Sequence, residues 1–139
     1  MAAYDPNNVF AKILRGEMPA HKVAEDDASL AFMDIMPRSE GHVLVIPKGP
    51  YRNLLDITPE AYAAMGPMVQ RVAVAARKAL GADGITILQA NEMASGQVVY
   101  HLHVHVMPRW AGVELQRPGI MGDQKALAAN AEKIRAALA

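Results

Sequence analysis

The sequence of 139 residues contains no cysteine, no excess of charge of either sign and no long run of apolar residues. Without cysteine, the chain can form neither disulfides nor zinc–thiolate sites. Its 14 Lys and Arg residues balance 14 Asp and Glu residues, so no net charge draws the whole molecule to nucleic acid or to an anionic membrane. An anionic ligand therefore has to be held by a local site.

Membrane and targeting patterns are missing as well. No stretch approaches the roughly 18 apolar residues of a membrane span. Residues 1–8 are polar and contain no apolar core of a signal peptide. We therefore expect one globular domain over residues 1–139, in the cytoplasm, with no membrane or nucleic-acid partner.

Apolar residues at spacings of three and four predict three helices. Gly66-Pro67 lies within the longest pattern and is expected to kink that helix or to delay its start. The last helix belongs to a C-terminal tail over residues 120–139. The expected helices are residues 9–14, capped by Asn7 or Asn8, residues 59–80, between Thr58 and Gly81, and a segment capped by Asp123.

Four segments have the composition of strands: residues 29–35, 41–47, 85–90 and 98–109. A short link that contains Pro37 and Gly41, residues typical of turns, joins the first two segments and predicts an antiparallel hairpin. Short links and segregated helices favour an α+β fold over a doubly wound parallel sheet.

His101, His103 and His105 alternate along the last of these segments. Side chains alternate between the two faces of a strand, so we expect the imidazoles on one face and the intervening apolar residues on the other. The spacing alone leaves three interpretations open. Such a row can bind zinc, copper, iron or nickel, form an ordinary polar surface, or catalyse a reaction without metal.

Further motifs accompany the histidines in a defined order. Gly96-Gln97 lies shortly before His-Leu-His-Val-His, and upstream come Phe-Ala-Lys-Ile (10–13), Ala-Phe-Met-Asp-Ile (31–35) and Gly-His-Val-Leu-Val-Ile-Pro-Lys (41–48). Together these motifs resemble the histidine triad (HIT) family, specifically its Hint-like branch, over residues 9–109. The resemblance implies an antiparallel five-stranded sheet with one long helix, a short N-terminal helix and a C-terminal helix. It also implies a homodimer joined through residues 84–91 and the long helix.

The resemblance implies a chemical role for each motif. Enzymes of this family are hydrolases that attack the α-phosphate of purine nucleotides with the middle histidine, here His103, and form a nucleotidyl-histidine that water hydrolyses. His105 is then expected to donate to a phosphate oxygen, with His101 organising the triad and Gln97 acting at the phosphate. No metal or other cofactor is required. The implied substrate contacts are Asp34 with the ribose, Phe10, Ile13, Phe32 and Ile35 with the base, and Asn91, Gly96 and Val98 with the phosphate and leaving group.

Some of these residues have ordinary alternatives. Asp34 can be a solvated turn residue, and Phe10 and Ile13 can be core residues. The favoured activity is that of an adenosine 5′-monophosphoramidase. The alternatives are a dinucleoside polyphosphate hydrolase, a metal-dependent hydrolase built on the histidine strand, and a nucleotide-binding regulatory module with little turnover. Attack by a neutral histidine predicts a rate that slows below about pH 6.

Two features depart from the family pattern. Many bacterial relatives have Cys-x-x-Cys near the first helix and bind zinc with two histidines, which the resemblance places at His42 and His101. Asn8 and Ala11 replace the cysteines here, so we expect no zinc and a buried His42 near the triad. Val98 stands where well-known Hint relatives have serine beside the leaving group, which predicts a tilt toward leaving groups that need no proton.

Overall fold

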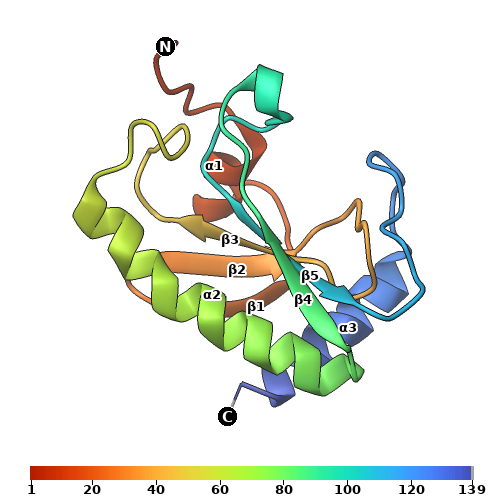
Figure 1. The fold of residues 1–139 in the computed structure, drawn as a ribbon. Helices are drawn as coiled ribbons and strands as arrows, with labels where there is room; N and C mark the ends of the chain where they lie inside the picture. Colours follow the sequence, from red (N-terminus) through yellow and green to blue (C-terminus); the bar gives the residue numbers. More distant parts are fainter. Residues whose placement is uncertain (139) are drawn as a thin grey trace.

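The computed structural model describes residues 1–138, which fold into five strands, three α-helices and one short 3₁₀ helix (Figure 1). The strands form one antiparallel sheet in the order β1-β2-β3-β5-β4. The expected α+β fold is confirmed. The elements are α1 (Val9–Leu14), β1 (Lys22–Glu25), β2 (Ser29–Met33), β3 (Val43–Pro47), α2 (Pro59–Leu80), β4 (Gly84–Leu88), η1 (Met93–Ser95), β5 (Val104–Arg109) and α3 (Gln124–Ala136).

The sheet has a different apolar cluster on each face. Alternate residues of β2, β3 and β5, such as Ala31, Val45 and Val106, pack against α2 and α3 in the larger cluster. The other alternate residues of β2 and β3, such as Phe32 and Leu44, pack against α1 in the smaller one. Because side chains alternate along a strand, this division also decides which residues can share the α1 face with a ligand.

All three helices begin at the residues that the sequence indicates. Asn8, Thr58 and Asp123 each accept a hydrogen bond from a backbone N–H in the first turn of the helix that follows. Helix α2 starts at Pro59 without delay, continues through Pro67, and ends at Gly81 with φ of 62°. Within residues 1–138, no helix is both long enough and apolar enough to cross a membrane.

Several boundaries differ from the expected ones. The segment patterns did not reveal β1, because only one of its four residues, Val23, is buried and no periodicity results. Strand β5 begins at Val104, not at residue 98, because the preceding segment bonds to the loop after β3, with Leu102 N donating to Tyr51 O at 2.9 Å. In the tail, residues 120–123 precede α3 and are not helical.

Candidate active site

The three alternating histidines lie just before β5 and at its start. Only His105 belongs to the strand, whereas His101 and His103 lie in the segment that leads into it. Even so, the apolar residues between them, Leu102 and Val104, are buried in the cluster beneath α2. The predicted division into an apolar face and an imidazole face is therefore confirmed.

His103 has a defined tautomer. Its Nδ1 lies 2.7 Å from His101 O, and a carbonyl oxygen only accepts, so Nδ1 carries the proton. Nε2 consequently keeps its lone pair in the neutral ring. The His103 ring packs edge to face against the rings of Phe10 and His105, with ring centroids 5.0 and 4.9 Å away, respectively.

Burial keeps the imidazoles neutral. It lowers the pKa of His103, although the bond to His101 O acts in the opposite direction, and it lowers the pKa of His105 to about 4. The expectation that the rate slows below about pH 6 therefore shifts: the neutral state of these rings persists to lower pH than that of an ordinary histidine.

His101 is fully buried, and its carbonyl oxygen accepts the hydrogen bond from His103. Its Nε2 donates to Pro47 O at 2.9 Å, and its Nδ1 accepts from the Tyr4 hydroxyl at 2.6 Å. Burial lowers the pKa of His101 to about 4. Both ring nitrogens are occupied, so the ring is held rigidly while its carbonyl orients His103.

His42 is buried beside the triad, as expected, and forms a chain of hydrogen bonds with it. Its Nδ1 lies 3.0 Å from the Arg38 N–H, which can only donate, so the proton of the neutral His42 ring is on Nε2. That Nε2–H donates to His105 Nδ1 at 2.9 Å. The proton of neutral His105 must then be on its own Nε2, which makes this nitrogen a hydrogen-bond donor. Burial lowers the pKa of His42 to about 3.

The structure separates the two histidines to which the resemblance assigns a zinc site. His101 bonds to Tyr4 and Pro47, whereas His42 bonds to Arg38 and His105. The two rings thus have different hydrogen-bond partners and do not contact a common third group. The sequence offered no sign of the partners, because Tyr4 lies 97 residues from His101.

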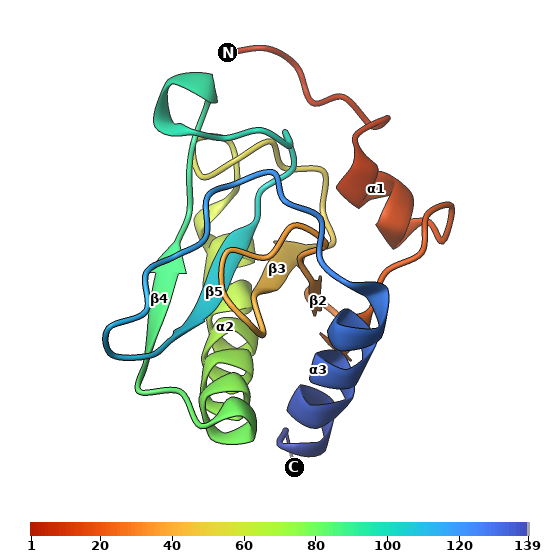
Figure 2. The same cartoon turned by 90° about the vertical axis from the view of Figure 1, so that its right-hand side faces the viewer.

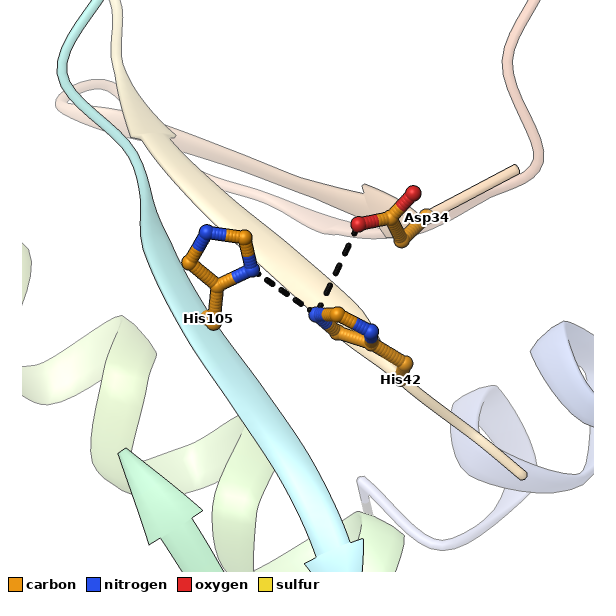
Figure 3. A group of neighbouring side chains, drawn as sticks. All are labelled: Asp34, His42 and His105. Carbon is orange, nitrogen blue, oxygen red and sulfur yellow. Dashed lines mark hydrogen bonds and ion pairs between the residues drawn. The ribbon is translucent and has the colours of Figure 1, made fainter. Parts of the chain in front are cut away.

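Asp34, His42 and His105 converge from three segments (Figure 3), and their ligand atoms lie within 4.8 Å of one another. His42 Nε2 is 3.5 Å from Asp34 Oδ2. A metal ion on Nε2 would require a lone pair there while Nδ1 also accepts from Arg38, leaving the ring without any proton. The bonding pattern therefore favours a hydrogen-bond chain over a metal site.

The Asp34 carboxyl group is partly buried at the end of β2. Its Oδ1 accepts from Met36 N at 2.8 Å, while Oδ2 has only the long contact to His42. Burial raises the pKa of Asp34, and the bond from Met36 opposes this. Oδ2 is therefore able to accept a hydrogen bond from a ligand.

An aromatic surface lies next to the histidines on the α1 face of the sheet. Phe10 and Phe32 meet edge to face with centroids 5.4 Å apart, and Phe10 also touches His103. Ile13 is buried in the same cluster, whereas Ile35 is 44% exposed. Phe10 and Phe32 are thus both core residues and part of the wall of the site.

Gln97 is buried, and its amide group is occupied by the protein. Oε1 accepts from Asn53 Nδ2 at 3.0 Å and from Glu92 N at 2.7 Å, while Nε2 donates to Arg52 O and Val99 O. These four bonds use the hydrogen-bonding capacity of the side chain. Gln97 thus shapes the loop before the triad and does not offer its amide to a ligand.

The rest of this loop is equally ordered. Asn91 Oδ1 accepts from Leu54 N and Gln89 Nε2, so this side chain also holds the loop. Gly96 has φ of 102°, which lies in the left-handed region that favours glycine. Val98 is 82% exposed. Its side chain is apolar and forms no hydrogen bond.

Glu92 was not among the expected site residues, yet it has the one positive φ outside glycine in the described chain. Its φ of 70° and ψ of 161° fall in a region that is essentially limited to glycine and costs roughly 1–3 kcal/mol. The carboxylate is held by Arg52 at 2.7 and 3.0 Å and by Asn53 at 2.5 Å. These contacts hold the strained backbone at Glu92 in place, in the loop that leads to Gly96.

Comparisons with known proteins find relatives over most of the chain. Residues 15–112 match the HIT domain family model. Adenylylsulfatase HINT3 of Arabidopsis thaliana is 41% identical over 85% of this chain, a match that spans 63% of that protein. Adenosine 5′-monophosphoramidase hnt1 of Schizosaccharomyces pombe is 40% identical over 73% of each chain. A crystal structure of a Hit-like protein from Bartonella henselae superimposes with a TM-score of 0.94 at 54% identity, covering 98% of this chain and 99% of the other.

Proposed function

Because this chain belongs to the HIT domain family, we propose that it is a hydrolase that attacks the α-phosphate of purine nucleotides, with activity like that of an adenosine 5′-monophosphoramidase. Relatives named as an adenylylsulfatase and an adenosine 5′-monophosphoramidase support a hydrolase acting on nucleotides. The observation that carries the proposal is the 2.7 Å bond from His103 Nδ1 to His101 O. It leaves Nε2 as a nucleophile in a neutral ring.

In the proposed first step, the lone pair of His103 Nε2 forms a bond to the α-phosphorus. The bond from phosphorus to the leaving group breaks, and its electron pair departs with that group, which takes up a proton from the solvent when it is an amine. The imidazole then carries a positive charge, which is favourable beside the His101 carbonyl that accepts from Nδ1. His105 Nε2–H donates to a non-bridging phosphate oxygen and stabilises the charge that accumulates there.

In the proposed second step, water attacks the phosphorus of the nucleotidyl-histidine. The P–N bond breaks and its electron pair returns to Nε2, which restores the neutral ring. One proton of the water is released, and the nucleotide monophosphate leaves. Two displacements replace one difficult hydrolysis.

The nucleoside is proposed to bind on the α1 face of the sheet. Asp34 Oδ2 is available for a ribose hydroxyl, because Oδ1 is taken by Met36 N. Phe10 and Phe32 offer aromatic surface for a purine beside His103. Ile35, exposed next to Asp34, adds apolar contact.

A substrate panel tests this function. The wild-type protein is incubated with adenosine 5′-phosphoramidate, adenosine 5′-phosphosulfate, a diadenosine polyphosphate and an adenylated lysine, each with and without a chelator. We expect release of AMP at rates that the chelator leaves unchanged. The amine-leaving substrates are expected to be the slower ones, because exposed Val98 offers no hydrogen bond as the amine gains its proton.

Other results of the panel would favour other functions. Binding of AMP without turnover of any substrate would favour a regulatory module. Loss of activity with the chelator and its recovery with zinc would favour a metal-dependent hydrolase. Preference for the dinucleotide by more than tenfold would favour a dinucleoside polyphosphate hydrolase.

We also propose that the protein forms a two-fold homodimer through β4 and α2. Strand β4 is at an edge of the sheet, and its Ile87 and Leu88 are 49% and 40% exposed. A hollow of about 410 Å³ lies between α2 and β4, lined mainly by apolar residues that include Met65, Val69, Ala73 and Ile87. A second copy would cover both the apolar surface and the open strand edge.

Light scattering at micromolar concentration is expected to give the mass of a dimer. Ile87→Glu should give a monomer, because the two-fold axis would bring two uncompensated carboxylates into the apolar contact. Val113→Glu, at another exposed apolar position, serves as the control and should remain dimeric. A monomeric wild-type protein would contradict the proposal.

A further inference from the structure

The segment between β5 and α3 (residues 110–123, the crossing segment) passes across one end of the sheet, from the side of β4 and β5 toward α3 (Figure 2). There it is hydrogen-bonded to residues 35–38, which belong to the turn between Asp34 and His42. Gln116 N donates to Arg38 O at 2.7 Å, and Arg38 Nε donates to Gln116 O at 2.9 Å. Gln116 Nε2 also donates to Pro37 O at 3.2 Å.

A second attachment lies at the end of the crossing segment. Gly122 N donates to Ile35 O at 2.7 Å. A Cβ at Gly122 would lie 3.0 Å from Pro37 Cδ, closer than ordinary van der Waals contact. Hydrogen bonds from Gln116 and Gly122, which lie far away in the sequence, therefore hold the turn at Ile35, Pro37 and Arg38.

The turn matters because the Arg38 amide determines the tautomer of His42. With Arg38 N–H on Nδ1, His42 presents Nε2–H to His105 Nδ1, and His105 keeps its proton on Nε2. If His42 instead carried its proton on Nδ1, its Nε2 would accept from His105 Nδ1–H. His105 Nε2 would then present a lone pair to a phosphate oxygen, and the two would repel each other.

Asp34 Oδ2 also faces His42 Nε2, at 3.5 Å, and favours the same tautomer. This contact is longer than a normal hydrogen bond, whereas the Arg38 contact is 3.0 Å. The position of the Arg38 amide is thus the stronger of the two local determinants.

From this geometry we infer that Gln116 is a positioning residue of the active site, which acts through Arg38 and His42 on the hydrogen bond that His105 donates. The crossing segment is in this sense part of the catalytic arrangement, although none of its residues touches the reacting atoms. The inference rests on the proposed function for its kinetic consequences. The tautomers themselves can be measured whether or not the protein hydrolyses nucleotides.

The test uses Gln116→Pro in the full chain, which removes the N–H that Arg38 O accepts. Glu114→Pro is the matched control, because its amide makes no hydrogen bond within residues 1–138. The first measurement is nitrogen-15 NMR of the imidazole rings at neutral pH, which distinguishes the two neutral tautomers. The second is kcat and KM for adenosine 5′-phosphoramidate.

In the wild type and in Glu114→Pro, His42 and His105 should both be in the Nε2–H form. In Gln116→Pro, we expect both rings to shift toward a mixture of tautomers and kcat to fall about fivefold to tenfold, the effect of one hydrogen bond made in the transition state. KM should change less than twofold. Unchanged tautomers in folded Gln116→Pro would overturn the inference, as would a rise in KM with kcat unaffected.

Gly122→Ala provides a second variant that keeps every hydrogen bond and displaces Pro37 by contact alone. It should shift the tautomers in the same direction and to a smaller extent, and it decides the question if Gln116→Pro does not fold. Absence of turnover in the wild type would contradict the proposed function and leave the tautomer measurement to decide this inference separately.

Discussion

Replacing His103 by alanine is expected to reduce turnover by roughly a thousandfold or more while leaving the protein folded. The variant loses the nitrogen that would attack phosphorus, and no other imidazole can take its place. His105 Nδ1 accepts from His42, and both nitrogens of His101 are occupied. Binding of AMP should weaken only slightly, because Asp34 and Phe32 are retained.

The covalent step can be followed directly. Wild-type protein incubated with a substrate labelled in the adenosine and denatured in alkali should carry label, and His103→Ala should carry none. His21→Ala is the matched control, because His21 bonds to Gln124 outside the site. That variant should keep both turnover and labelling. Turnover above a tenth of the wild-type rate in His103→Ala would exclude His103 as the nucleophile.

The free energy of unfolding is expected to fall by several kcal/mol between pH 7 and pH 5. Burial lowers the pKa of His42 to about 3 and those of His101 and His105 to about 4, whereas an unfolded histidine titrates near about 6.5. Below about pH 6.5 the unfolded chain therefore binds more protons than the folded one. Each such histidine contributes a slope of about 1.4 kcal/mol per pH unit, and stability is lost as the pH falls.

Urea unfolding at several pH values between 7 and 5 measures this slope. The raised pKa of Asp34 acts in the opposite direction, from the pKa of an unfolded aspartate, about 3.9, upward to its own raised value, so it can offset at most one proton of the slope at the acid end of this window. His42→Gln should reduce the slope by about one proton, or 1.4 kcal/mol per pH unit. A stability that is flat from pH 7 to pH 5 would show that the buried imidazoles are not held neutral.

Local patterns predicted most of the fold. Apolar spacing and the caps Asn8, Thr58 and Asp123 located all three helices, because capping and helical periodicity depend on residues within one or two turns. The same reasoning failed for β1, which is short and half exposed, and for the start of β5. Both depend on which distant backbone groups are available as hydrogen-bond partners.

The candidate site was also predictable only in part. The motif order identified the family, and the alternation of residues 101–105 identified the imidazole face, because a strand alternates its side chains whatever surrounds it. Sequence reasoning assigned Gln97 to the phosphate, whereas the structure occupies its amide with four protein bonds. It also missed Glu92, whose strained backbone has no signature in the sequence.

The sequence by itself therefore determined the family and the fold class, and it singled out His103 as the proposed nucleophile. Only the tertiary structure decided the state in which each imidazole is held. His42 reaches His105 across 63 residues, Tyr4 reaches His101 across 97, and Gln116 reaches Arg38 across 78. A tautomer depends on whether the atom opposite each ring nitrogen donates or accepts, and the packing of distant segments places that atom there.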